Sequence, residues 1–516
     1  MISRRPAVHL LGLTLVAVLL AVVPSRSEAA PGLIVGVTDD AFRWQPDAAA
    51  AVSRDLGLSA FRLTLEWSPG RTELADGDAV NLDAMVAATA GLRILVTVTG
   101  AQQSAPIDSP SRDAYCTYIR GVLGRYPTIN DVVIWNEPNL GFFWQPQFDA
   151  SGASAAPAAY EALLARCWDV LHAFRPGVNM ILTVSPSGND NPSALSNISH
   201  SPGAFIRNIG AAYRASGRRA PIFDTIGHNP YGLSSAEAPW ARHLSPSHIG
   251  EGDIDRLVAA LGDGFRGTSQ PVPGACAGAP SCPTIWYLEA GYQTVPDPAH
   301  RRLYTGREND AHPLPDGAGI ATGSEPTQSS QLIAGIRLAY CQPYVGGFFN
   351  FLLWDEADLT RWQSGVLWID GSHKAAYDAL RLVIDETRNG RTDCAHLAAA
   401  SVTPSRPAPD ALLERLEWSP TTVFSAFNEI WRFSVAARSD EFFEARIDQL
   451  GRTGSRSVTH QAVLRVAGNL RKSRPRVIQF ARTRMPPGRY RVVLRVTRTS
   501  RPRLTVARSS PVFVVK

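Results

Sequence analysis

The sequence predicts an α/β protein in which a (β/α)8 TIM barrel is followed by a C-terminal, all-β sandwich of the immunoglobulin type. Three observations predict this fold class. Short β-rich segments alternate with longer helical patterns from residue 33 to about residue 385, a Pro-rich segment follows near residue 400, and only short β-branched segments come after it. At 516 residues the chain exceeds what one hydrophobic core usually serves, so two domains are expected.

Eight segments of the first region are predicted strands because they are short and rich in apolar and β-branched residues. They are Leu33–Val37, Ala60–Leu65, Arg93–Val98, Asp131–Trp135, Asn179–Val184, Thr225–His228, Thr284–Leu288 and Gly347–Leu352. Helical patterns lie between them at Pro46–Leu56, Leu82–Ala90, Ser111–Tyr126, Pro157–Phe174, Ala204–Ser216 and Ser329–Tyr340. Such alternation is typical of a (β/α)8 barrel. A doubly wound sheet is the alternative, although no Gly-x-Gly-x-x-Gly turn follows the first strand to favour nucleotide binding.

The N-terminus has the composition of a secretory signal peptide over residues 1–29. Arg4 and Arg5 precede an apolar segment, Ala7–Val23, that is short for a membrane-spanning helix. Ser27 and Ala29 follow as the small residues that a signal peptidase reads, so cleavage is expected near Ala29. An uncleaved anchor is the alternative. No later segment is long and apolar enough to cross a membrane, so we expect a secreted protein that is extracellular or associated with the cell wall.

Six cysteines remain, an even number that suits disulfide formation in an oxidising compartment. Cys276 and Cys282 bracket a loop of small residues and are expected to pair. The other pairs expected are Cys116 with Cys167 and Cys341 with Cys394. No Cys/His cluster has the spacing of a zinc site, and we expect no metal or organic cofactor.

The barrel is expected over residues 30–399, a semi-rigid Pro-rich linker over 400–409, and the β-sandwich over 410–516. From Ser401 onward there are 22 Lys/Arg against 8 Asp/Glu, which leaves 29 against 38 in the rest of the chain. A basic domain beside an acidic barrel could hold the protein at an anionic cell-surface polymer. The alternative is a solvated surface that happens to use arginine. The basic cluster at Arg471–Arg476 has no interleaved aromatic residues, so nucleic-acid binding is not expected.

Two carboxylates end predicted barrel strands. Glu137 follows Val133–Asn136 and precedes Pro138. Glu289 comes directly after the apolar segment Trp286–Leu288. Because the C-terminal ends of the strands surround the mouth of a TIM barrel, both side chains are expected there. A pair of carboxyl groups is what glycosidic cleavage needs, one as a proton donor and the other as a nucleophile or base. Glu251 and Glu308 are alternatives to Glu289.

The Asn-Glu-Pro motif on the fourth strand, with a Glu on the seventh, resembles clan A of the glycoside hydrolases, which includes the cellulase-like family 5 and family 39. The resemblance covers residues 33–385. It implies that Glu137 is the acid/base, that Asn136 contacts the sugar 2-hydroxyl and that Glu289 is the nucleophile. It also implies that Arg62 supports the nucleophile and that Trp354 forms the floor of the substrate site.

The sixth strand departs from the pattern of this clan. The clan often ends this strand His-x-Tyr or His-Pro-Tyr, whereas this chain reads His228-Asn229-Pro230-Tyr231. Either His228 keeps the role implied by the clan or Asn229 takes its place, and Tyr231 can donate a hydrogen bond to Glu289.

Aromatic residues crowd the predicted loops at the same mouth, and aromatic rings offer faces on which sugar rings stack. Trp67 and Trp144 are therefore added to the expected substrate-binding residues. The sequence thus predicts a secreted glycoside hydrolase acting on a polysaccharide or oligosaccharide, and the resemblance to clan A implies that it is a retaining enzyme that works through a covalent intermediate. The alternatives are a catalytically inactive carbohydrate-binding protein of the cell surface, or a transglycosylase on the same scaffold.

Overall fold

The computed structural model of the chain describes residues 32–397 and several segments beyond 412. Gaps within the first range are 195–196, 244, 246, 277–281, 311, 318–325 and 396. The C-terminal segments described are 413–418, 423–424, 430–437, 441–450, 460–472, 474–481, 488–498, 505–509 and 513–515. The predicted signal peptide, residues 1–29, and the predicted linker, residues 400–409, lie outside the described residues.

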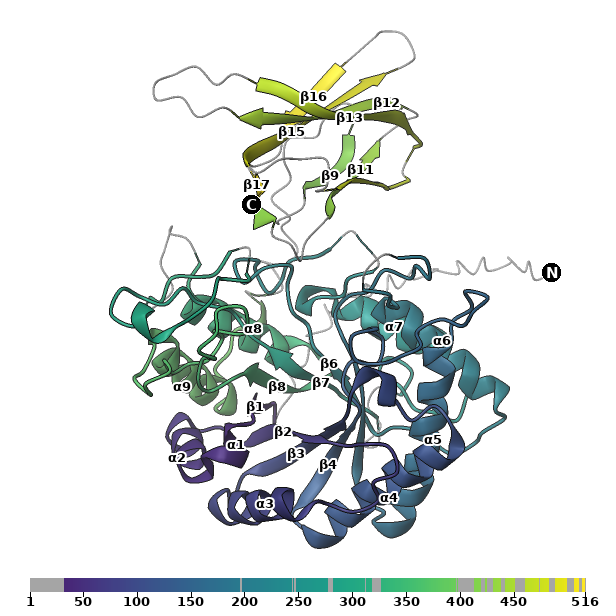
Figure 1. Cartoon of the computed structure of the whole chain (residues 1–516), viewed down its shortest axis with the longest axis vertical. Helices are drawn as coiled ribbons and strands as arrows, with labels where there is room; N and C mark the ends of the chain where they lie inside the picture. Colours follow the sequence, from purple (N-terminus) through teal and green to yellow (C-terminus); the bar gives the residue numbers. More distant parts are fainter. Residues whose placement is uncertain are drawn as a thin grey trace, which may run out of the picture.

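A closed barrel of eight parallel strands forms the first domain (Figure 1). Each strand pairs with the next along the chain, and the eighth pairs with the first. The strands are β1 (Ile34–Thr38), β2 (Ala60–Glu66), β3 (Arg93–Thr99), β4 (Ile129–Ile134), β5 (Asn179–Val184), β6 (Thr225–His228), β7 (Ile285–Ala290) and β8 (Val345–Phe351). The prediction of a TIM barrel is confirmed, with every expected strand within about two residues of its observed place.

Helices surround the barrel (Figure 1). They are α1 (Ala41–Trp44), α2 (Pro46–Leu56), α3 (Asp76–Ala88), α4 (Ser109–Arg125), α5 (Ala156–Phe174), α6 (Pro202–Ala215), α7 (Ile254–Phe265), α8 (Gln328–Cys341) and α9 (Ala375–Arg388). Side-chain caps fix several of their N-termini, as where Asp108 accepts from the N–H of Ser111 and Ser201 from that of Ala204. No helix among the described residues is long and apolar enough to cross a membrane.

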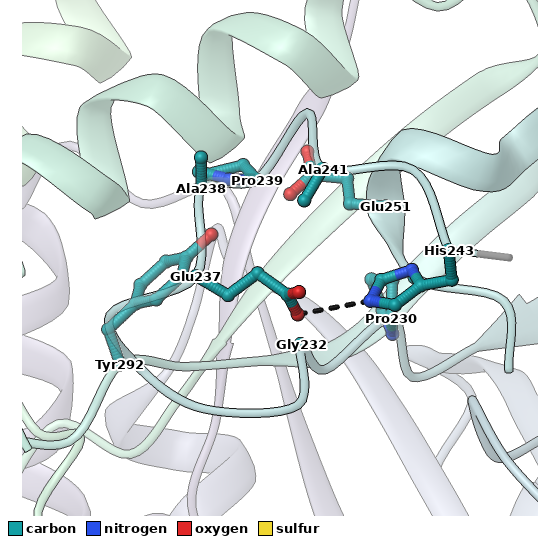
Figure 2. A pocket seen from close by; sticks show the side chains of 10 residues that line it. Pro230, Gly232, Glu237, Ala238, Pro239, Ala241, His243, Glu251 and Tyr292 are labelled. Atoms are coloured by element: carbon teal, nitrogen blue, oxygen red, sulfur yellow. Dashed lines mark hydrogen bonds and ion pairs between the residues drawn. The ribbon is translucent and has the colours of Figure 1, made fainter. Parts of the chain in front are cut away.

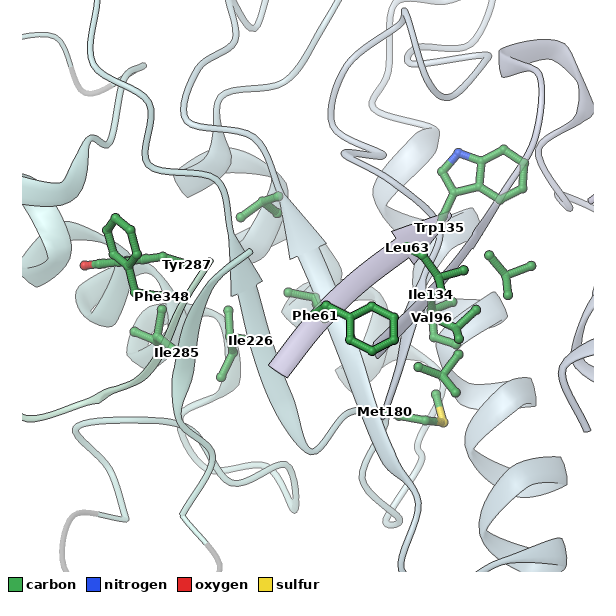
Figure 3. Packing of buried hydrophobic residues seen from close by; sticks show 14 of the residues in the cluster. Phe61, Leu63, Val96, Ile134, Trp135, Met180, Ile226, Ile285, Tyr287 and Phe348 are labelled. Atoms are coloured by element: carbon green, nitrogen blue, oxygen red, sulfur yellow. The ribbon is translucent and has the colours of Figure 1, made fainter. Parts of the chain in front are cut away.

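Two layers of apolar side chains hold the barrel together, because successive residues of a strand point to opposite faces. Inside the barrel a small cluster is formed by Ala60, Leu95, Val133, Ile181, Trp286, Leu288 and Phe349. The opposite faces of the strands pack against the helices in a much larger cluster, part of which is drawn in Figure 3. Arg62 is two residues after Ala60 and therefore also points into the barrel, one layer nearer its mouth.

Three disulfides are present, and all three pairs match the expectation. Cys116 on α4 is joined to Cys167 on α5, and Cys341 at the end of α8 is joined to Cys394. Cys276 and Cys282 close a short loop before β7. Two of these bonds link segments more than fifty residues apart and therefore tie neighbouring parts of the outer layer together.

The C-terminal region is all-β. One sheet contains β10 (Val423–Phe424), β17 (Phe513–Val515), β15 (Gly488–Arg498), β12 (Glu441–Leu450) and β13 (His460–Leu470), with β16 (Thr505–Ser509) also paired to β15. A second sheet contains β14 (Arg476–Ala481), β11 (Ile430–Ala437) and β9 (Leu413–Trp418). Buried side chains of both sheets, including Phe433 and Ile478 from one and Phe443 and Leu494 from the other, form one cluster. The immunoglobulin-type topology stays a prediction.

Candidate active site

The end of β4 places Glu137 through an unusual backbone. Trp135 and Glu137 both have positive φ angles, 65° and 39°, which non-glycine residues rarely adopt. The buried Trp135 is held from several sides, since its N–H donates to the carbonyl of Val98 at 3.0 Å and its indole N–H to the carbonyl of Phe143 at 2.7 Å. A strained conformation that its surroundings enforce is typical of a functional site.

Glu289 lies near the end of β7, beside an irregularity in the sheet. Tyr287 pairs with Phe348 and Ala290 with Asn350, so β7 contains one residue more than β8 over this stretch. A bulge of this kind redirects the side chains around it. The carboxylate of Glu289 consequently lies at the barrel mouth with 13% of its side chain exposed.

Arg62 connects the two strand ends. Its Nη1 lies 2.6 Å from Oε1 of Glu289, and its Nη2 donates to Oδ1 of Asn136 at 3.0 Å. Its Nε donates to Oγ1 of Thr97 on β3 at 2.6 Å, which fixes the guanidinium plane. The Arg62 side chain is only 2% exposed. A buried cation with all three groups occupied keeps the negative charge of Glu289 favourable and orients Asn136 beside Glu137.

Glu137 is buried, and its Oε1 accepts a hydrogen bond of 2.8 Å from Nδ2 of Asn229. Burial, and next the negative charge of Glu289, raise the pKa of Glu137 to about 8, although the bond from Asn229 opposes this shift. Glu137 therefore carries its proton at neutral pH. A carboxyl group that keeps its proton beside Glu289, which is paired with the cation of Arg62, is the arrangement that general acid catalysis requires.

Tyr231 donates from its hydroxyl to Oε2 of Glu289 at 3.2 Å, so each oxygen of Glu289 has a donor. Burial, and next the charge of Glu289, raise the pKa of the Tyr231 phenol well above its ordinary value, which keeps it a donor. The Tyr231 ring lies 4.9 Å from that of Trp362 and 6.3 Å from that of Phe351. These aromatic contacts with the end of β8 and with the loop after it hold the phenol in place.

His228 does not reach the carboxylates. It is fully buried, and its Nε2 bonds to the carbonyl of Ile249 at 2.9 Å. Burial lowers the pKa of His228 to about 4, so the ring is neutral near pH 7. Of the two alternatives that the sequence left open at this strand, the structure brings Asn229 to Glu137 and gives His228 a place in packing the following loop.

The expected substrate-binding tryptophans are placed differently from one another. Trp354, after β8, is partly exposed, and its backbone N–H donates to Oδ2 of the buried Asp39 at 3.4 Å. Trp67 and Trp144 are 2% and 0% exposed and pack edge-on against Tyr115 and Tyr160. A ring without an exposed face cannot stack on a sugar, so the expectation for Trp67 and Trp144 is corrected to packing beneath the loops.

The other glutamates considered for the nucleophile lie elsewhere. Glu251 is buried at the start of a short 3-10 turn before α7, where burial raises its pKa well above the ordinary value. Glu308 accepts from the N–H of Asp310 in the loop after β7, and burial raises its pKa to about 7. Within the part of the chain that the structure describes, Glu251 and Glu308 form no hydrogen bond or ion pair with Glu137 or Arg62. Among the described residues no group of three or more His, Cys, Asp or Glu side chains is arranged to hold a metal ion.

Thr97 supports the site and was not singled out from the sequence. It holds Arg62, and the alternation of β3 could have indicated it, because Thr97 is two residues after the inward-facing Leu95. Trp362 is one of the aromatic residues that the sequence places in the loops at the barrel mouth, but no local signal indicates that it packs on Tyr231.

Comparison with known proteins finds similar solved structures at low sequence identity. No protein-family profile and no curated protein sequence matches the chain. Among solved structures, it is similar to a family 39 glycoside hydrolase from Bacteroides cellulosilyticus WH2, with 13% identity, 88% of this chain and 81% of that one covered, and a TM-score of 0.47. It is also similar to the GH53 catalytic domain from Ignisphaera aggregans, with 17% identity, 69% and 98% covered, and a TM-score of 0.43.

A third similar structure is a β-glucuronidase from Bacteroides uniformis, with 11% identity, 94% of this chain covered and a TM-score of 0.39. This chain spans less than half of that protein, 46% of its length. With TM-scores below 0.5, these similarities establish neither the fold nor the function of this chain.

Proposed function

We propose that the protein is a secreted retaining glycoside hydrolase that acts on a polysaccharide or oligosaccharide. One observation carries the proposal: a buried, protonated Glu137 lies in the electrostatic field of Glu289, whose two oxygens are bonded to Arg62 and Tyr231. Double displacement at an anomeric carbon needs two such groups, a proton donor and a carboxylate that acts as the nucleophile. Glu137 and Glu289 are proposed as catalytic residues and Asn136 as a contact of the sugar.

In the first step Glu289 attacks the anomeric carbon while Glu137 gives its proton to the departing glycosidic oxygen. The C–O bond to the leaving group breaks as the ester bond to Glu289 forms. The negative charge that raises the pKa of Glu137 is then neutralised in the ester, so Glu137 is a stronger acid and remains ionised. In the second step Glu137 takes a proton from water, the water attacks the same carbon, and Glu289 leaves as a carboxylate.

The test is a panel of aryl glycosides and glycans, with the anomeric configuration of the first product followed by NMR. Retention and covalent labelling of Glu289 by a 2-fluoro glycoside are expected. Glu137→Gln should lower kcat/KM on a glycan by at least about 100-fold, the usual contribution of acid–base catalysis. Glu289→Gln should lower it at least as much, because the glycosyl ester can no longer form. Inversion, or full activity in either variant, would contradict the assignment. Products longer than the substrate would indicate transglycosylation instead of hydrolysis.

Secretion is part of the same proposal. The three disulfides and the signal-like N-terminus favour an oxidising, extracellular location. Fractionation of the producing cells, with N-terminal sequencing of the mature protein, tests this. A protein that begins after Ala29 and lies outside the cell is expected.

The C-terminal domain is proposed to contact an anionic cell-surface polymer. Arg471, Lys472, Arg474 and Arg476 are all exposed between β13 and the start of β14. Retention of the enzyme on cell walls should then fall as salt rises, because exposed charges are screened. Arg471→Glu combined with Arg474→Glu should weaken this retention and leave hydrolysis of a small aryl glycoside unchanged. Equal retention of the variant would refute the contact.

A further inference from the structure

The long loop between β6 and α7, residues 229–253, carries Asn229 and Tyr231 at its start. These two residues are the partners of Glu137 and Glu289. Both contacts are single hydrogen bonds from a loop, so the position of this loop decides whether they form. The contacts that fix the loop therefore bear on the site.

His243 lies in the middle of this loop between two carboxylates. Its Nδ1 is 2.6 Å from Oδ2 of Asp253, and its Nε2 is 3.1 Å from Oε2 of Glu237 (Figure 2 shows the contact with Glu237). The His243 side chain is 8% exposed and that of Asp253 0%. Burial alone would lower the pKa of His243, but the bonds to Asp253 and Glu237 outweigh it and raise the pKa to about 9. The ring is thus an imidazolium that donates from both nitrogens.

The contacts continue from His243 toward the site. The same Oε2 of Glu237 accepts from the N–H of Leu233 at 2.7 Å, two residues after Tyr231. A Cβ placed on Gly232 would lie 2.9 Å from this oxygen, so the carboxylate is packed closely against the chain. Pro230 and Gly232 line the same small cavity as Glu237 and His243 (Figure 2).

At the other end the contacts reach α7. Asp253 accepts from the backbone N–H groups of His243 and Gly250, at 3.1 Å and 3.2 Å, and lies 3.5 Å from Nη1 of Arg256 on α7. The His248 ring lies 4.2 Å from that of His243. Burial, and next the charge of His243, lower the pKa of His248 to about 3, so that ring is neutral and does not compete with His243 for the carboxylates.

From this chain of contacts we infer that His243, through Glu237 and Leu233, is a positioning residue that holds Asn229 and Tyr231 against the two carboxyl groups. The inference rests on the proposed function. It assigns a catalytic consequence to a buried charge cluster that itself touches no reacting atom. Without the imidazolium, Glu237 and Asp253 have no shared cation, and the first turn of the loop is free to move away from the barrel mouth.

The test compares His243→Ala, Glu237→Ala and Glu237→Gln with the wild type, with Arg93→Met as a matched control. Arg93 pairs with the buried Asp131 at the start of β3 and β4, away from the mouth, so its loss destabilises the barrel without touching the loop. We expect His243→Ala and Glu237→Ala to lower kcat about tenfold and to change KM less than threefold, because misplacement by ~1 Å costs up to ~100-fold. Glu237→Gln keeps an oxygen for the N–H of Leu233 and should recover most of the loss.

A second readout separates positioning from stability. The bond from Asn229 opposes the raised pKa of Glu137, so its loss in His243→Ala should move the pKa of Glu137 upward, by about 1–2 units for a typical charged hydrogen bond. NMR of the 13C-labelled carboxyl groups, assigned with Glu137→Gln, measures this without turnover. If the wild type hydrolysed no substrate, the proposed function would be contradicted. The effect of His243 on the pKa of Glu137 could still be measured. Variants that lose thermal stability as Arg93→Met does, with kcat and the pKa of Glu137 unchanged, would overturn it.

Discussion

Glu137 should make the barrel less stable as the pH rises, and Glu137→Gln should remove this dependence. In the unfolded chain its carboxyl titrates near the ordinary 4.5, whereas in the folded chain burial and Glu289 raise the pKa to about 8. Between these values the unfolded state has released a proton that the folded state still holds. The stability linked to this residue is therefore full below about pH 4.5 and is lost as the pH rises toward 8, by up to ~1.4 kcal/mol per pH unit.

From about pH 5 to about pH 7.5 this amounts to at most about 3 kcal/mol. Glutamine is neutral throughout, so the free energy of unfolding of Glu137→Gln should exceed that of the wild type by a margin that grows by this amount. Urea denaturation of the barrel, followed by tryptophan fluorescence at both pH values, measures the margin. Other titrating groups cancel in the difference between the two proteins.

Glu66→Gln is the matched control, because it removes an exposed carboxylate at the end of β2. No comparable growth of the margin is expected for it. If the margin for Glu137→Gln were the same at both pH values, Glu137 would not be protonated in the folded protein. The assignment of the general acid would then fail on a measurement that needs no substrate.

Three further predictions concern single contacts. Lys374→Met should cost about 3–5 kcal/mol in urea unfolding, because it leaves the buried Asp355, now 2.6 Å from Lys374, without its cation; an additional Asp355→Leu should recover part of the loss, and a loss under about 1 kcal/mol would contradict this. Replacing Cys116 and Cys167 by Ser should lower the free energy of unfolding by about 4 kcal/mol through the freed loop, measured against the wild type under non-reducing conditions, and an unchanged midpoint would refute it. Asn229→Leu should shift the basic limb of the pH dependence of kcat/KM to higher pH by about 1–2 units, because the pKa of Glu137 rises when its charged form loses this hydrogen bond. A shift to lower pH would contradict this.

The barrel could be predicted from the sequence because its signal is local. Each strand is a short β-rich segment, and the period of two along β2 already places Arg62 on the same face as Ala60. Glu137 and Glu289 were likewise placed at strand ends by the residues beside them. For both glutamates the structure gives the partners that the sequence could only suggest, namely Asn229 for Glu137 and Arg62 with Tyr231 for Glu289.

What could not be predicted depends on contacts between distant loops. Trp67 and Trp144 follow strands and look available to a ligand, but neighbouring aromatic rings cover them. The backbone at Trp135 and Glu137 has positive φ angles although neither residue is glycine, so no composition rule identifies it. The choice between His228 and Asn229 depends on Ile249, which lies at the far end of a loop of more than twenty residues.

The disulfide between Cys116 and Cys167 also bears on how the barrel withstands a cut in its backbone. It links α4, before β4, to α5, after it, so β4 and the following Glu137 lie inside a closed covalent loop. The turn at residues 149–153 is the exposed stretch within this loop where a protease would cut most readily. A chain clipped there would remain one covalent molecule, with the two helices that flank β4 still joined to each other.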